Sequence, residues 1–124
     1  MPTKERLSDF ITAVVTGDHV DAIREFYDEN ATMQENLTAP RRGRDVLMAH
    51  EARALARLQK MHTHPPKSVV HDNDIVAINW VFDATDKQGV TRRIEELALQ
   101  QWRGDRIISE QFFYDTASAW RIID

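Results

Sequence analysis

The first part of the chain spaces its hydrophobic residues at helical intervals. Between residues 4 and 16 the apolar positions fall at i, i+3, i+4, i+7 and i+8, which places them along one side of a helix. These residues are Leu7, Phe10, Ile11, Val14 and Val15. Thr3 is suited to cap this helix and Gly17 to end it, so we predict a helix over residues 4–16.

Two more helices are predicted before residue 61. Asp18 can cap the second helix, whose buried side is formed by Val20, Ile23, Phe26 and Tyr27. The third helix is expected over residues 44–60, with a stripe formed by Leu47, His50, Ala54, Leu58 and Met61. This stripe places His50 among apolar neighbours. Pro65 and Pro66 prevent any further continuation of the helix.

A strand-like pattern occupies residues 31–36 and most of the second half of the chain. The later segments are rich in Val, Ile and aromatic residues, and they cover residues 67–71, 75–84, 90–102 and 106–114. Short turns separate these segments, so we expect consecutive strands to pair as antiparallel hairpins. Residues 116–124 still hold three large apolar side chains, which should pack on the domain itself or on a partner. They are Trp120, Ile122 and Ile123.

The order of these elements predicts an α+β fold. Two helices, a strand, a loop at residues 37–43, a third helix and four antiparallel strands follow one another. Such segregation places the helices on one face of the sheet. At 124 residues the chain is long enough for one domain with one core and too short for two.

Composition and charge narrow the classes of function. The formal charge of −4 argues against a nucleic-acid binder, which needs a basic patch. We interpret the basic cluster RRGR at residues 41–44 as a solvated bend, with phosphate binding as the alternative. The chain shows no secretion signal, and no apolar stretch approaches the roughly 20 residues of a membrane span. The absence of cysteine excludes disulfides and fits a reducing compartment, so we expect a cytoplasmic protein.

Several short motifs, in this order, resemble one known superfamily. They are Gly17-Asp18, Ala22-Ile23, YDENATMQEN at residues 27–36, Gly43-Arg44, WRGDRI at residues 102–107 and Phe113-Tyr114-Asp115. Over nearly its whole length the chain resembles the nuclear transport factor 2-like superfamily, which includes ketosteroid isomerases and SnoaL-like polyketide cyclases. The resemblance implies a cystatin-like roll, in which a cone-shaped, curved antiparallel sheet and three helices enclose an apolar pocket. It also implies a homodimer that pairs through the convex face of the sheet.

The catalytic groups of the isomerases can be carried over one at a time. Their general base, which moves a proton next to a carbonyl, matches Glu35, although Asn36 follows it here in place of proline. The tyrosine that donates to the oxyanion falls on Phe10, and the acid that assists it falls on Ala98. Each oxyanion-hole donor is typically worth roughly 10²–10³ in rate. Two missing donors therefore argue against a genuine ketosteroid isomerase.

The strand registers decide which side chains face the pocket. In the strand over residues 75–84, alternation puts Val76, Ile78, Trp80 and Phe82 on one face, which is the natural pocket or core face. For the last two strands, the register of the family turns Glu96, Ala98, Gln100, Glu110, Phe112 and Tyr114 inward. A tight turn at Arg103-Gly104 would instead place Ser109 and Gln111 with Gln100, because a slip of one residue reverses every side chain. Both registers are open at this point.

The inner face carries several carboxylates. If Glu35, Glu96 and Glu110 converge, they cannot all stay ionised, so each needs a proton, an arginine or a histidine. His50 is the candidate partner, although a histidine on an apolar stripe is more often an ordinary core residue. Glu35 itself either faces the pocket as a base or points to solvent, where it would pair with an arginine.

The remaining polar candidates have two interpretations each. Tyr27 and Tyr114 could donate hydrogen bonds to an oxygen of a ligand, or only to buried backbone groups. The spacing of His62 and His64 puts both rings on one face of a strand, but the sequence supplies no third metal ligand. We predict no metal and no cofactor, since the chain also has no glycine-rich phosphate loop and no nucleophile elbow.

Two functions follow from these observations. The first is a small-molecule enzyme of the SnoaL-like kind, using metal-free acid–base chemistry such as isomerisation, cyclisation or dehydration, with Glu35 as the base. The second is a non-catalytic module that binds an apolar ligand or dimerises. In either case we expect a small apolar or polycyclic molecule as the partner, with no nucleic acid and no membrane. The predicted ligand contacts are Phe10, Tyr27, Met33, His50, Trp80, Phe82, Glu96, Gln100, Glu110, Phe112 and Tyr114.

Overall fold

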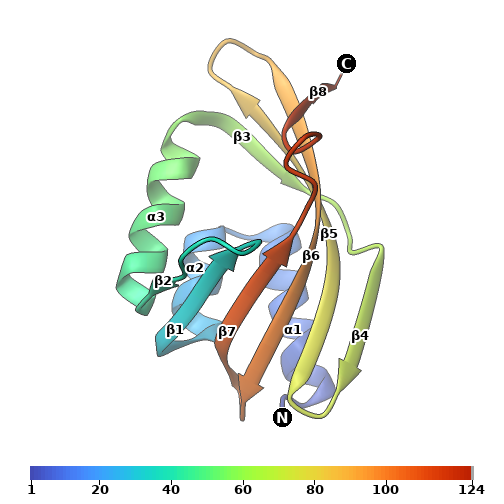
Figure 1. The fold of residues 1–124 in the computed structure, drawn as a ribbon. Helices are drawn as coiled ribbons and strands as arrows, with labels where there is room; N and C mark the ends of the chain where they lie inside the picture. The colour runs from blue at the N-terminus through green and yellow to red at the C-terminus, as the bar shows by residue number, and fades with distance from the viewer. Residues whose placement is uncertain (124) are drawn as a thin grey trace.

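Three helices from the first half of the chain lie against one side of a curved sheet (Figure 1). The computed structural model describes residues 1–123. The helices are α1 (Lys4–Thr16), α2 (His19–Phe26) and α3 (Arg44–Ala56). The strands are β1 (Tyr27–Glu35), β2 (Arg41–Arg42), β3 (Leu58–Thr63), β4 (Ser68–Asp72), β5 (Ile75–Asp86), β6 (Thr91–Arg103), β7 (Arg106–Phe113) and β8 (Arg121–Ile123). Among the described residues, no helix has both the length and the apolar character needed to cross a membrane.

The first two helices begin where the sequence predicts and α1 also ends there, but α2 ends at Phe26, and Tyr27, predicted on its buried side, is the first residue of β1. The Thr3 hydroxyl accepts a hydrogen bond from the Arg6 backbone N–H at 3.0 Å, which caps α1. Gly17 ends α1, and a β-carbon on this residue would lie 2.7 Å from the carbonyl oxygen of Ala13. The Asp18 carboxylate then accepts from two backbone N–H groups of α2. The predicted helix over residues 4–16 is therefore confirmed.

The prediction for the third helix is wrong in its last turn. α3 ends at Ala56, and the next residues form β3, which pairs antiparallel with β5. Leu58 and Met61 belong to the predicted helical stripe, yet they line the same interior from the strand. The edge of β5 offers hydrogen bonds to a whole strand, and this tertiary pairing outweighs the helical spacing.

Two shorter strands also lie in segments predicted otherwise. β1 starts at Tyr27 instead of residue 31, and the polar residues 28–30 fall in an irregularity of its pairing with β7. β2 lies within the predicted loop and pairs with β1. The tail joins the sheet, because β8 pairs with β6, but two of its three apolar side chains remain exposed: Trp120 is 41% and Ile122 is 66% exposed.

The strands form one sheet in the order β2-β1-β7-β6-β5-β3, with β4 also on β5 and β8 also on β6. The four strands predicted as consecutive hairpins, β4 to β7, pair antiparallel as expected. β1 and β7 pair in parallel, so the sheet is mixed. The prediction of a purely antiparallel sheet is therefore wrong for this pair of strands. The α+β class and the curled, cystatin-like architecture are confirmed.

The register of β7 is set by a single extra residue. The two-residue turn between Arg103 and Arg106 alone would pair Gln100 with Ser109, which is the shifted register. Ile108 is accommodated as a bulge, since the pairing changes between Trp102–Ile107 and Gln101–Ser109. Beyond the bulge Gln100 pairs with Glu110, and Ala98 pairs with Phe112. The register of the family is thus confirmed, and the shifted register is wrong.

An aromatic cluster of the core lies where α1 and α2 meet the sheet. Phe10 makes edge-to-face contacts there with three aromatic rings at centroid distances of 5.3, 6.2 and 5.8 Å. These rings belong to Phe26, Tyr27 and Trp102. The sheet curves away from this cluster toward α3 and leaves a cavity beside it.

Candidate functional site

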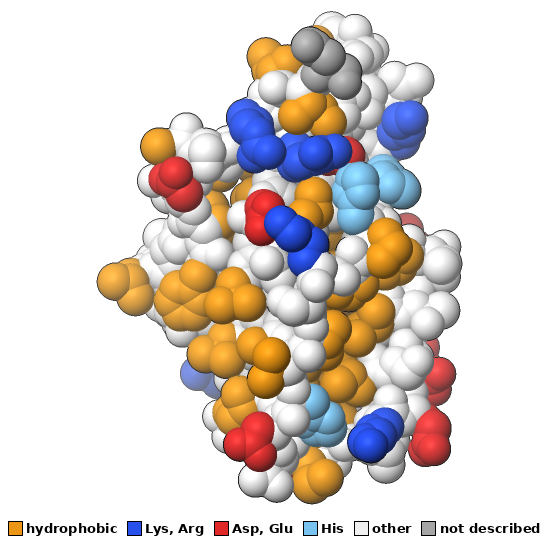
Figure 2. All heavy atoms as spheres, turned by 90° about the vertical axis from the view of Figure 1, so that its right-hand side faces the viewer, with side chains coloured by type: hydrophobic (Ala, Val, Ile, Leu, Met, Phe, Trp, Pro, Cys, Tyr) orange, Lys and Arg blue, Asp and Glu red, His pale blue; other side chains and the backbone are white. Residues whose placement is uncertain are grey.

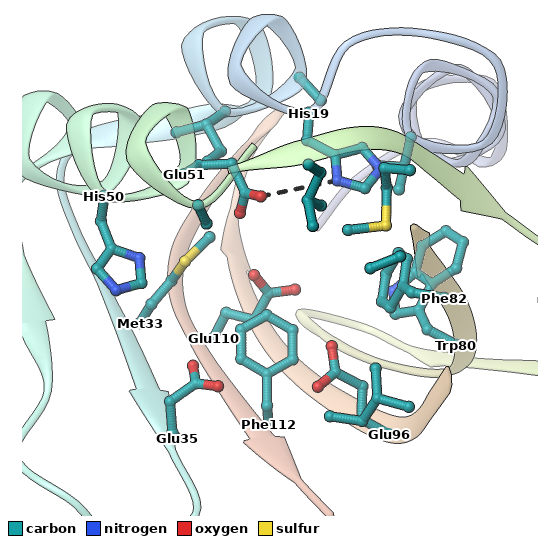
Figure 3. A pocket seen from close by; sticks show the side chains of 18 of the residues that line it. His19, Met33, Glu35, His50, Glu51, Trp80, Phe82, Glu96, Glu110 and Phe112 are labelled. Carbon is teal, nitrogen blue, oxygen red and sulfur yellow. Dashed lines mark ion pairs between the residues drawn. The ribbon is translucent and has the colours of Figure 1, made fainter. Parts of the chain in front are cut away.

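A cavity of about 450 Å³ lies between the inner face of the sheet and the helices. This volume is within the range of ordinary small-molecule sites. Phe10, Val14 and Ile23 line its inner end. The aromatic side chains labelled in Figure 3 stand around the space between sheet and helices. The cavity therefore offers a largely apolar wall to a ligand.

Most of the predicted contacts do line this cavity. Those that line it are Glu35, Phe10, Tyr27, Met33, His50, Trp80, Phe82, Glu96, Glu110 and Phe112. Two of the predicted contacts do not reach its surface. Gln100 is fully buried behind Glu110, and Tyr114 lies beside Glu35 outside the lining set.

Glu35 ends β1 and points into the cavity while being held from two sides (Figure 3). Its carboxylate accepts from the Arg41 guanidinium at 3.3 Å and from the Tyr114 hydroxyl at 3.3 Å. Asn36, which stands where the isomerases have proline, has a positive φ of 48°. Its side-chain oxygen accepts from the backbone N–H of Tyr114 at 3.1 Å. Asn36 thus positions the tyrosine that donates to Glu35, and Glu35 both faces the cavity and pairs with an arginine.

Glu96 lies in the middle of β6 and also points into the cavity. Within residues 1–123 its carboxyl has no hydrogen-bond or ion-pair partner. Burial, together with the smaller contributions of the negative charges of Glu35, Glu110 and Glu51, raises the pKa of Glu96 to about 8. At neutral pH this carboxyl is therefore protonated and can donate a hydrogen bond.

Glu110 is buried at the inner end, where it belongs to a chain of hydrogen bonds. The Tyr27 hydroxyl and the Gln100 amide both contact its carboxyl, and Trp102 in turn donates to Gln100. Burial raises the pKa of Glu110 to about 7, although the hydrogen bonds from Gln100 and Tyr27 lower it. Burial and the neighbouring Glu110 also raise the pKa of Tyr27. The expected convergence of the three glutamates is thus present, and two of them have raised pKa values.

The acid–base pair on the helical side of the cavity was not predicted. His19 at the start of α2 lies 3.9 Å from Glu51 of α3 and contacts the Thr63 hydroxyl at 2.9 Å (Figure 3). Glu51 follows Leu47 at i+4, so helical spacing alone would have placed Glu51 on the inner face of α3. His50, the predicted partner of the glutamates, is mostly exposed at the rim and forms no ion pair within the described residues.

The outer mouth of the cavity carries charged groups and one tryptophan. Arg92 pairs with Asp86 at 2.8 Å, and Arg57 lies nearby among the lining residues. Trp120 lines the mouth from the C-terminal segment, with a positive φ of 57°. The sequence marked Trp120 only as part of an apolar tail.

The two histidines considered for a metal lie together on the outer face of the sheet. The rings of His62 and His64 have centroids 4.5 Å apart, as the strand spacing predicts. His64 contacts the Asp83 carboxylate at 2.7 Å, and both oxygens of that carboxylate also accept from Arg93. Asp83 is therefore already saturated by protein donors.

Comparison with known families agrees with this geometry. The sequence profile of the SnoaL-like domain matches residues 7–110. The chain belongs to the SnoaL-like family. No curated protein matches it in sequence.

Solved structures of SnoaL-like and related proteins share the fold at low sequence identity. A ketosteroid isomerase-like protein from Catenulispora acidiphila, crystallised with trimethylamine, is 22% identical with a TM-score of 0.75 over 94% of this chain and 90% of its own. A candidate SnoaL-like polyketide cyclase from Jannaschia is 12% identical, with a TM-score of 0.76 over 91% of this chain and 88% of its own. TerC, co-crystallised with polyporic acid, is 14% identical, with a TM-score of 0.74 over 91% of each chain. At these identities the likeness establishes the fold alone.

Proposed function

We propose that this SnoaL-like protein catalyses acid–base chemistry on a small apolar molecule that carries a carbonyl group. The observation that supports this proposal is the contrast between two carboxyl groups in one cavity. Glu35 pairs with the Arg41 guanidinium at 3.3 Å, whereas Glu96 is buried without a partner among residues 1–123 and its pKa is raised to about 8. A carboxylate paired with a cation and a carboxyl that keeps its proton are suited to act as base and acid.

The chemistry assigns each carboxyl a role. Glu35 takes a proton from the carbon next to the carbonyl, and the electron pair of the C–H bond moves to give an enolate. Glu96, still protonated, donates a hydrogen bond to the oxygen on which negative charge develops. Glu96 lies two residues before Ala98 on the same face of β6. In this proposal it supplies the acid that is missing at position 98.

The cavity and the structural neighbours support a ring-containing ligand. Trp80, Phe82 and Phe112 provide flat apolar surfaces, and 450 Å³ accommodates two or three fused rings. Among the structural neighbours, TerC was crystallised with polyporic acid, and several others are candidate polyketide cyclases. We therefore propose a small polycyclic or otherwise apolar carbonyl compound as the substrate class.

Deuterium exchange on a simple ketone tests the proposal without knowledge of the natural substrate. The probe is 2-tetralone, a two-ring ketone, incubated in D₂O and followed by proton NMR at the carbon next to its carbonyl. We expect the protein to accelerate this exchange and Glu35→Gln to abolish the acceleration while the ketone still binds. Glu95→Gln, on the outer face of the same strand as Glu96, is the matched control and should exchange like the wild type. Equal exchange by Glu35→Gln and wild type would refute the role of Glu35.

A non-catalytic binding module is the alternative. The observation that favours it is the pairing of Glu35 with Arg41, which occupies one oxygen of the base. In addition, Phe10 and Ala98 occupy the two positions at which the isomerases carry oxyanion donors, and neither side chain can donate a hydrogen bond. Binding of 2-tetralone by the wild type without any accelerated exchange would support this alternative.

We also propose that the chain forms a homodimer through the outer face of the sheet. Hydrophobic side chains gather in the middle and lower part of the face shown in Figure 2. The strand pairing places five exposed hydrophobic residues of β4 to β7 on the outer face of the sheet. They are Val70, Ile75, Leu97, Leu99 and Phe113. Exposed apolar patches of this kind mark interaction surfaces. Sedimentation should show twice the 14.4 kDa of one chain and a monomer for Leu99→Asp; a wild-type monomer would refute the proposal.

We further propose that the protein is located in the cytoplasm. It rests on the absence of cysteine from the sequence. Expression of a tagged protein followed by fractionation tests it.

A further inference from the structure

The inner end of the cavity is closed by the buried chain of Trp102, Gln100, Glu110 and Tyr27. We propose that this chain is a one-proton switch that decides whether Tyr27 donates or accepts a hydrogen bond in the cavity. In its protonated state it selects ligands that place an uncharged acceptor oxygen, such as a ketone, at the inner end. The inference rests on the proposed function only in that a small molecule enters this cavity.

The direction of the chain is fixed from Trp102. An indole N–H can only donate, and Nε1 of Trp102 lies 3.0 Å from Oε1 of Gln100. The amide of Gln100 therefore turns its NH₂ group toward Glu110, at 2.7 Å from Oε2. Because that NH₂ group also can only donate, Oε2 of Glu110 accepts in every protonation state.

Only the other oxygen of Glu110 can then carry a proton. Oε1 faces the hydroxyl of Tyr27, and either of these two groups can be the donor. When Glu110 is ionised, Tyr27 donates to it, and the phenolic oxygen offers only lone pairs to the cavity. When Glu110 is protonated, Oε1–H donates to the phenolic oxygen. The hydrogen of Tyr27 is then released toward the cavity, which Tyr27 lines.

The charges around Glu110 allow both states to occur near neutral pH. From β1 it faces Glu35, from β6 Glu96, and from α3 Glu51, and these negative charges favour its protonated form. The basic side chains around this site have other partners. Arg41 pairs with Glu35, His19 lies beside Glu51, and the guanidinium groups of Arg44 and Arg106 both donate to the backbone carbonyl of Tyr27. The two hydrogen bonds from Gln100 and Tyr27 favour the ionised form. Burial, which makes the largest contribution and also favours the protonated form, combines with these effects to place the pKa of Glu110 at about 7.

The switch gives the ligand a chemical signature. A ketone oxygen can only accept, so it pairs with Tyr27 when Glu110 holds the proton. Above the pKa of Glu110, binding of the ketone must be accompanied by uptake of one proton, and affinity falls about tenfold per pH unit. A hydrocarbon of the same shape makes no such contact, and its affinity should not change with pH.

The switch can be observed first without any ligand. The chain has two tyrosines, so carbon-13 labelling of the ring Cζ in the Tyr114→Phe variant leaves a single signal, that of Tyr27. We expect this signal to titrate with a midpoint near pH 7. In Tyr114→Phe combined with Glu110→Gln the signal should stay constant, because the glutamine NH₂ donates to Tyr27 at every pH. A constant signal in the protein that retains Glu110 would overturn the switch, whatever the protein does to a substrate.

Calorimetry with 2-tetralone and tetralin, which lacks the carbonyl, then tests the selectivity. These measurements use the Glu96→Gln background, in which position 96 cannot take up a proton. In two buffers of different ionisation enthalpy at pH 8.5, this protein should take up close to one proton per 2-tetralone bound and none with tetralin. In the same background, Glu110→Gln should bind 2-tetralone equally well from pH 6 to pH 8.5, and Tyr27→Phe should bind it no better than tetralin. Glu95→Gln is the control and should keep the proton uptake. Proton uptake that persists in Glu110→Gln would overturn the assignment to Glu110, whereas loss of deuterium exchange alone would bear only on the proposed function.

Discussion

Replacing Glu96 by glutamine should stabilise the protein by an amount that grows with pH. In the folded protein the Glu96 carboxyl is buried beside other negative charges, and its pKa rises from 4.5 to about 8. Between these values the folded state keeps a proton that the unfolded chain has released. Stability therefore falls as pH rises through this window. Glutamine has nearly the same shape and never ionises, so the variant escapes this loss.

The magnitude follows from the two pKa values. Below about pH 4.5 Glu96 is protonated in both states and contributes no loss, and well above pH 8 the loss is complete. Between about pH 5.5 and pH 8.5, linkage gives a loss of about 3 kcal/mol from this one carboxyl. Glu110 contributes a similar loss, but it is present in both proteins and cancels in the comparison. The advantage of Glu96→Gln should therefore grow by about 3 kcal/mol over this range.

Urea unfolding followed by tryptophan fluorescence measures the free energy of unfolding at each pH. The control is Glu95→Gln, the same substitution one residue earlier on the opposite face. The Glu95 carboxylate is exposed and lies 3.2 Å from the Lys67 ammonium, and this partner lowers its pKa. Glu95→Gln should therefore gain no stability as pH rises. If wild type and Glu96→Gln lose stability in parallel from pH 5.5 to pH 8.5, Glu96 is not held protonated in the cavity.

Two further variants test the scaffold around the site. Asp83→Asn should destabilise the protein at pH 7 by about 1–2 kcal/mol, because Arg93 and His64 hold the pKa of Asp83 well below its ordinary value. That penalty should shrink as pH falls below about 4, because the unfolded chain then takes up a proton at Asp83 while the folded carboxylate stays ionised, and an equal penalty at pH 7 and pH 3 would contradict this account. Gly17→Ala should cost about 1–2 kcal/mol in urea unfolding, since the new β-carbon would meet the Ala13 carbonyl oxygen at 2.7 Å; an unchanged midpoint would show that the helix end moves freely.

The parts of the fold that depend on local signals could be predicted from the sequence. Thr3, Gly17 and Asp18 mark helix ends through contacts within a few residues, and the structure has those ends. β3 could not be predicted in this way, because Leu58 and Met61 fit a helical stripe and become strand only through the edge of β5. The register of β7 depends on the bulge at Ile108, where neighbouring residues carry no distinctive signal.

The candidate site was predictable where alternation along a strand decides it. Glu35, Glu96 and Glu110 were expected to converge, and they point into one cavity. His19 and Arg41 were missed because they enter the cavity from a helix start and a two-residue strand, where periodicity gives no direction. Their placement depends on the packing of whole elements against one another.

The dependence on pH of deuterium exchange into 2-tetralone tests the central claim most directly. The ketone is kept at saturating concentration at every pH, so that the pH dependence of its binding does not affect the rate. With Glu35 as the base and protonated Glu96 as the donor, the saturated rate should fall on the alkaline side with a midpoint near the pKa of Glu96, about 8. In Glu96→Gln, whose amide still donates, this alkaline fall should disappear, whereas Glu35→Gln should show no acceleration at any pH. An alkaline fall that is unchanged in Glu96→Gln would contradict the assignment of acid and base on which the account depends.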